Sequence, residues 1–167
     1  LSLINKHPDN KILLIEKESS FAKHQTGHNS GVIHAGVYYQ PGSLKAEFCR
    51  EGLKETISFC SENNIPYEQC GKLLVATNQI ELQRMHELHE RCKANEIGVE
   101  VLDQKQLNEI EPNIIGIGAL LVKSTGIVDY KLITKKMSEE FESKGGKFLL
   151  NSEVVNLEIG FFELCDN

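Results

Sequence analysis

A short stretch near the start of the chain holds most of the residues that could do chemistry. Residues 23–49 read KHQTGHNSGVIHAGVYYQPGSLKAEFC, which includes four glycines, three histidines and two adjacent tyrosines. Glycines let backbone N–H groups approach an anion closely, and hydroxyl and amide side chains add further donors. The stretch therefore suits a nucleotide cofactor that carries a diphosphate. The alternative is a glycine-rich surface turn whose polar residues are incidental.

An acidic residue, Glu16, ends the apolar run KILLI at residues 11–15 that precedes this stretch. In dinucleotide-binding folds, an acid at the end of the second strand hydrogen-bonds the ribose hydroxyls, because a carboxylate only accepts hydrogen bonds. The alternative is a strand end that faces solvent. The G-x-G-x-x-G fingerprint that would come first is absent, so we expect a strand and most of a helix to precede residue 1.

Four further side chains in this stretch could act on a substrate. His34 lies in the apolar, tightly turning segment VIHAG and could serve as a general base. Tyr38 and Tyr39 could contact substrate through their hydroxyls, and Lys45 could pair with a carboxylate. For His34 the alternative is a histidine whose ring is satisfied by backbone groups. For the other three it is structural packing or a solvated helix face.

Composition limits the classes of function. The net charge of −6 disfavours a nucleic-acid surface. No apolar run approaches the ~18 residues of a membrane span. The five cysteines include no C-x-x-C pair, so neither a disulfide framework nor a zinc ribbon is indicated. The sequence HELHE at residues 86–90 lacks the H-E-x-x-H spacing, and no metal site is expected. We expect a cytoplasmic protein, with peripheral contact to the inner membrane left open for the intact protein.

The elements that must position these residues alternate between strand and helix, which favours an α/β fold. We expect helices at residues 43–64, 78–96 and 129–144, with Ser43, Asn78 and Asp129 as N-caps and a short helix opened by Asp103 with Gln106. We expect strands at residues 11–15, 71–77, 117–123, 147–150 and 153–157. Four consecutive apolar residues predict that the first strand is buried on both faces. Residues 160–167 carry little pattern.

The segment HQTGHNSGVIHAGVYYQPGSLKA, residues 24–46, closely resembles the L-2-hydroxyglutarate oxidase/dehydrogenase family of FAD enzymes. The likeness continues through CGKLLVAT, EPNIIGIGAL, STGIVDY and GGKFLLNSEV, and so covers nearly the whole chain. The resemblance implies the arrangement of the broader superfamily, as in D-amino acid oxidase and glycerol-3-phosphate dehydrogenase, with FAD in a Rossmann-like domain and substrate under a separate sheet.

The resemblance implies a role for each matching residue. Glu16 would bind the adenosine ribose, Val154 would offer its backbone to the adenine, and His34 would be the catalytic base near the flavin ring. The remaining cofactor contacts would run along the diphosphate, the ribityl chain and the flavin ring, and they would come from Thr26, Gly27, His28, Asn29, Ser30, Ala35 and Gly36.

The resemblance also implies domains and an activity. Residues 1–64 and 127–167 would form an incomplete Rossmann-like FAD-binding domain, and residues 65–126 part of a mixed or antiparallel substrate lobe. The chain is therefore expected to be an internal fragment. The intact parent would oxidise L-2-hydroxyglutarate to 2-oxoglutarate by hydride transfer to flavin, with its electron acceptor left open. The alternatives are a superfamily member acting on another 2-hydroxy acid, an amino acid or glycerol 3-phosphate, and an inactive remnant.

Overall fold

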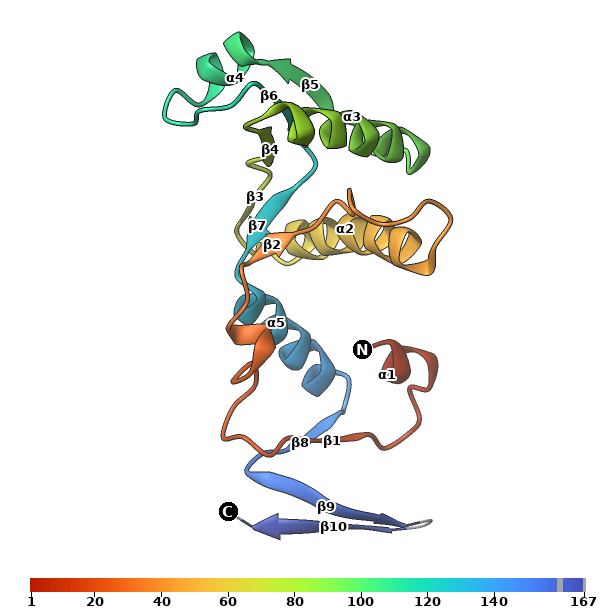
Figure 1. Ribbon diagram of the computed structural model, residues 1–167. Coiled ribbons are helices and arrows are strands. Elements are labelled where there is room, and N and C mark those ends of the chain that lie inside the picture. The colour runs from red at the N-terminus through yellow and green to blue at the C-terminus, as the bar shows by residue number, and fades with distance from the viewer. Residues whose placement is uncertain (159–160, 167) are drawn as a thin grey trace. The chain divides into compact units, whose positions relative to one another are not determined.

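The chain forms two compact units (Figure 1). The computed structural model describes residues 1–158 and 161–166. The first unit combines Leu1–Ser30 with the chain from Asp129 onward, and the second is Gly31–Val128. Residues 31–64 therefore belong to the second unit, whereas the sequence-based division grouped them with residues 1–30. The assignment of FAD-binding and substrate domains stays a prediction.

The first unit is built around a parallel strand pair. β1 (Leu13–Ile15) pairs with β8 (Lys147–Leu149), which follows helix α5 (Tyr130–Ser143). Phe148 of β8 packs against the rings of Phe21 and Phe141, with centroids 4.8 and 5.1 Å away. The short helices α1 (Ser2–Lys6) and η1 (Gln25–Gly27) complete this part of the unit.

One expectation for the first unit was wrong, the burial of β1 on both faces, and one strand carried no sequence signal. Leu13 and Leu14 of β1 remain 45% and 41% exposed, because in the described part of the chain β1 has one strand neighbour, β8. The last residues of the chain, whose sequence carries little pattern, contain β10 (Phe161–Asp166). This strand pairs antiparallel with β9 (Ser152–Glu158). The partner strand, and not the local pattern, supports β10.

The second unit contains two antiparallel sheets and three helices. One sheet has the order β2 (Val32–Ile33), β7 (Gly126–Val128), β3 (Tyr67–Glu68). The other has the order β4 (Leu73–Ala76), β6 (Gly118–Leu121), β5 (Glu100–Asp103). Helix α3 (Gln79–Ala94) packs on β4 and β6, and α4 (Gln104–Ile110) on β5 and β6 (Figure 1). Helix α2 (Leu44–Glu62) links β2 to β3.

The predicted helix N-caps are confirmed. The Ser43 hydroxyl accepts from the Ala46 N–H, and the side chains of Asn78 and Asp129 accept from backbone N–H groups in the first turns of α3 and α5. Asp103 and Gln106 form a capping box. These side chains satisfy N–H groups that have no partner within the helix.

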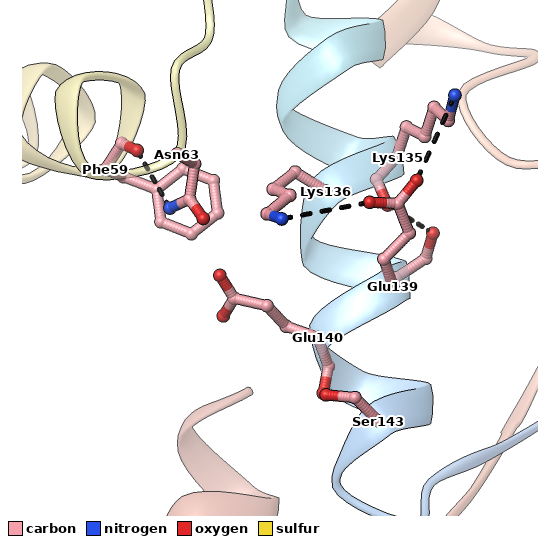
Figure 2. Close-up of polar contacts among 8 residues, drawn as sticks. Phe59, Asn63, Lys135, Lys136, Glu139, Glu140 and Ser143 are labelled. Atoms are coloured by element: carbon pink, nitrogen blue, oxygen red, sulfur yellow. Dashed lines mark hydrogen bonds and ion pairs between the residues drawn. The ribbon is translucent and has the colours of Figure 1, made fainter.

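Polar contacts also order a helix end and a helix surface, as Figure 2 shows. At the end of α2 in the second unit, Asn63 Nδ2 donates to the Phe59 carbonyl at 2.9 Å. On α5 in the first unit, Glu139 pairs with Lys135 at 3.9 Å and with Lys136 at 4.0 Å. Such solvent-exposed pairs contribute only about 0.3–0.5 kcal/mol each. Across the described residues, no helix is long and apolar enough to cross a membrane.

The core of the second unit anchors the segment that follows β2. Ala35 and Val37 are buried in one cluster with Cys92 of α3 and Val122, which follows β6. Neighbouring clusters join α3 to β4 and β6 and α4 to β5 and β6. The chain between His34 and Tyr38 is therefore fixed by side chains on either side of Gly36.

Candidate cofactor and substrate sites

Glu16 stands at the carboxyl end of β1 in the first unit. Its N–H donates to the Leu149 carbonyl at 2.9 Å, and its carbonyl accepts from the Ser152 N–H at 3.0 Å. Its carboxylate Oε1 accepts from the Glu18 N–H at 3.0 Å. The acid is thus fixed at the edge of a parallel pair where open α/β sheets bind their ligands.

The loop that follows, residues 18–30, is held by its own polar groups. His24 Nε2 lies 2.8 Å from Glu18 Oε1, and Asn29 Nδ2 donates to the Thr26 carbonyl at 2.9 Å. His28 Nδ1 lies 3.0 Å from the His24 carbonyl. Because a carbonyl only accepts, His28 Nδ1 must carry the proton in this contact. The side chains that the sequence assigned to the cofactor therefore first serve to shape the loop.

Gly27 is required by packing in this loop. A Cβ atom added there would overlap the carbonyl oxygen of Ala22 and would lie 2.9 Å from Lys131 Cε. Ala22 itself has a φ of +59°, which brings the chain back toward η1. The glycine signal in the sequence thus has a structural cause, whether or not a diphosphate approaches the loop.

A hollow of about 540 Å³ lies in the first unit beside this loop. It is lined by Ser20, Phe21, Ala22, Lys23, His28, Lys131, Thr134, Lys135 and Ser138. Three lysines and several hydroxyls, with no acid among the lining residues, fit an anion such as the diphosphate of FAD. His28 is the one predicted cofactor residue in this lining. Thr26, Asn29 and Ser30 are exposed and lie outside it.

Val154, the predicted adenine contact, lies on β9 and is 46% exposed. It lies two residues after Ser152 on the same strand, and the Ser152 N–H donates to the carbonyl of Glu16. The structure therefore brings Glu16 and the start of β9 together at one sheet end. The adenine contact itself stays a prediction.

A second, smaller hollow of about 140 Å³ lies in the second unit. Its lining contains five predicted site residues together with three that the sequence did not indicate, and comprises His34, Ala35, Gly36, Val37, Tyr38, Tyr39, Lys72 and Thr125. Gly36 has a φ of +83°, and its carbonyl accepts from the Tyr39 N–H at 3.1 Å. That tight turn presents His34 and both tyrosines to one hollow.

Side chains of helices α2 and α3 hold the backbone of this turn. Cys49 Sγ lies 3.2 Å from the His34 carbonyl, and burial raises the pKa of the Cys49 thiol, so the sulfur keeps the proton that it donates. Arg91 Nη1 donates to the Tyr38 carbonyl at 3.3 Å, and Asn95 Nδ2 donates to the Tyr39 carbonyl at 2.8 Å. Asn95 is only 8% exposed, so its amide is a buried donor with a defined partner.

Lys72 is the charged residue among the three lining residues that sequence reasoning missed. Its Nζ lies 3.5 Å from the Tyr38 hydroxyl and 4.9 Å from the centroid of the Tyr38 ring. The only sequence signal was its place in the segment CGKLLVAT, one of those that carry the family resemblance. Lys45, which was predicted to contact substrate, is exposed in the first turn of α2 and does not line the hollow. Its substrate role stays a prediction.

Comparison with known proteins identifies the family. Residues 2–164 match the profile of the FAD dependent oxidoreductases. The chain belongs to this family. The predicted resemblance, FAD as cofactor and the oxidoreductase class are thereby confirmed.

Two curated relatives share one name. The L-2-hydroxyglutarate dehydrogenase of Escherichia coli K12 is 54% identical over 157 residues, which cover 94% of this chain and 37% of that protein. The mitochondrial L-2-hydroxyglutarate dehydrogenase of Caenorhabditis elegans is 46% identical over 146 residues, covering 87% and 34%. The chain thus spans a little over a third of the length of these relatives.

Solved structures confirm the fold. The L-alpha-glycerophosphate oxidase of Mycoplasma pneumoniae, solved with FAD bound, superimposes with a TM-score of 0.82 at 24% identity, over 92% of this chain and 42% of that one. Glycine oxidase from Geobacillus kaustophilus gives a TM-score of 0.81 at 15% identity, over 92% and 44%. The predicted α/β fold of this flavoenzyme class is therefore correct.

Proposed function

We propose that this chain forms part of an FAD-dependent dehydrogenase that oxidises L-2-hydroxyglutarate to 2-oxoglutarate. The observation that carries the proposal is the 54% identity to the Escherichia coli enzyme of that name over 94% of this chain. The two hollows support it, because one is cationic and polar and the other groups a histidine, two tyrosines and a lysine.

In this proposal the first unit binds the cofactor. Glu16 accepts hydrogen bonds from ribose hydroxyls, and the cations around the larger hollow, Lys23, Lys131 and Lys135, neutralise a diphosphate. His28, with the proton on Nδ1, presents Nε2 as an acceptor when the ring is neutral. FAD, when bound, supplies the acceptor for the two electrons and the hydrogen that leave C2 of the substrate.

The second unit acts on the substrate. His34 is exposed at the smaller hollow, and in its neutral form it takes the proton of the C2 hydroxyl as the ketone forms. The tyrosine hydroxyls and Lys72 Nζ offer hydrogen bonds to the oxygens of the substrate. Contacts from α2 and α3 fix the turn at Gly36 and so keep these groups in place during the reaction. Groups that are already positioned need not be reordered when the substrate reacts.

The proposal is tested with a chimera in which this chain replaces the matching 157 residues of the Escherichia coli relative. Turnover with an electron-accepting dye is compared for L-2-hydroxyglutarate, L-lactate, glycine and glycerol 3-phosphate. We expect kcat/KM to be highest for L-2-hydroxyglutarate. A chimera that retains FAD and prefers another of the four substrates would refute the proposal.

A further inference from the structure

One cation in the smaller hollow has no role assigned by the sequence. Lys72 is the only lysine or arginine among the lining residues, and the lining contains no acid. Within the part of the chain that the structure describes, Lys72 forms no ion pair, whereas Lys93 and Lys123 pair with Glu90 and Glu100. The positive charge of Lys72 is thus not neutralised by a carboxylate of its own unit.

The backbone of Lys72 is firmly placed. Its N–H donates to the Val122 carbonyl at 3.1 Å, and its carbonyl accepts from the Val122 N–H at 2.9 Å. Val122 is fully buried, and the preceding Gly71 N–H donates to the carbonyl of Thr125, another lining residue, at 3.0 Å. The lysine therefore extends from a fixed point at the start of β4.

The ammonium end of Lys72 is positioned by Tyr38. The hydroxyl contact of 3.5 Å and the 4.9 Å approach to the ring centroid place Nζ beside a surface that attracts cations. Tyr38 is in turn held through its carbonyl by Arg91 of α3. An ammonium group has three N–H donors, and the tyrosine hydroxyl uses one of them. The remaining donors are suited to an anion.

We propose that Lys72 binds a carboxylate of the substrate in this hollow, and that Tyr38 positions its ammonium group for that task. The inference rests on the proposed function for the identity of the substrate, a small dicarboxylate. The point charge of Lys72 together with the tyrosine hydroxyls favours a dicarboxylate over a neutral molecule of the same size. The predicted lysine at position 45 is not needed for this contact.

The test uses glutarate, which has two carboxylates and no hydroxyl to oxidise, as the probe. The 167-residue chain is titrated with glutarate, and saturable shifts in the NMR signals of Tyr38 and Lys72 give the dissociation constant. Losing a hydrogen bond to a charged group should raise this constant on the order of 10- to 100-fold in Lys72→Met. Lys72→Arg, which keeps the charge, should retain part of the affinity.

The matched control is Lys54→Met, which removes an exposed lysine of α2 outside the hollow and changes the net charge equally. Far-UV circular dichroism checks that each variant is folded. The proposal is overturned if the wild-type chain gives no saturable shifts, or if Lys72→Met binds glutarate as tightly as Lys54→Met does. The titration involves no flavin, so such a failure is distinct from a failure of the dehydrogenase assay.

Discussion

At the scale of single residues, the structure shows that two glycines of one sequence motif are required for different reasons. Gly27 and Gly36 both belong to the stretch that looked like a cofactor loop. Gly27 is required because its neighbours Ala22 and Lys131 leave no room for a Cβ atom, and Gly36 because its φ is +83°. The sequence could predict that this stretch turns tightly. It could not show which contacts require the glycines, since Lys131 lies about a hundred residues away.

Gly27→Ala should destabilise the first unit. The added methyl group must displace the Ala22 carbonyl or the chain around it, and overpacking of this kind costs about 1–3 kcal/mol. We expect a lower midpoint of thermal unfolding, measured by circular dichroism. Gly98→Ala, where a Cβ would meet nothing within 4 Å, is the control and should change the midpoint little. Equal midpoints for both variants would contradict the packing argument.

At the scale of elements, local signals were predictable and distant pairings were not. The N-caps Ser43, Asn78 and Asp129 depend on residues within three positions, and all were predicted from the sequence. The strands β2 and β3 are two residues long and exist because β7 pairs with both of them, some 60 to 95 positions away. The place of Lys72 was not predictable either, because it depends on hydrogen bonds to Val122, which lies 50 positions further along the chain.

Helix α3 should control the tyrosine turn through Asn95. In Asn95→Asp, a carboxylate would replace the amide that donates to the Tyr39 carbonyl, leaving two acceptors face to face in a buried place. We expect a loss of stability of about 1–3 kcal/mol near pH 7 and weaker glutarate binding. The native state should raise the pKa of the introduced acid, so the loss should shrink as pH falls toward about 4.

Asn63→Asp is the matched variant for that prediction. Asn63 also caps the end of a helix, and its Nδ2 donates to the Phe59 carbonyl at 2.9 Å (Figure 2), but Phe59, unlike Tyr39, does not line the hollow. It should lower the unfolding midpoint while leaving glutarate binding unchanged. If Asn95→Asp also leaves glutarate binding unchanged, α3 does not position the tyrosines.

At the scale of the whole molecule, the family match covers both candidate sites. The FAD dependent oxidoreductase profile spans residues 2–164, and so includes both units. The cofactor residues predicted from the sequence fall mainly in the first unit, and the substrate residues fall in the second. The assignment of cofactor binding to one unit and substrate binding to the other stays a prediction from the family resemblance. The boundary between the units could not be predicted, because its position after Ser30 follows from the pairing of β2 with β7.

The most direct test of the account is anaerobic addition of L-2-hydroxyglutarate to the FAD-loaded chimera, followed by the visible absorption of the flavin. We predict that the flavin band is bleached, and that His34→Ala slows bleaching by about 10²- to 10⁴-fold, the usual contribution of a general base. A chimera that retains FAD but is not bleached would contradict the proposed function. Bleaching at an unchanged rate in His34→Ala would remove His34 from the mechanism.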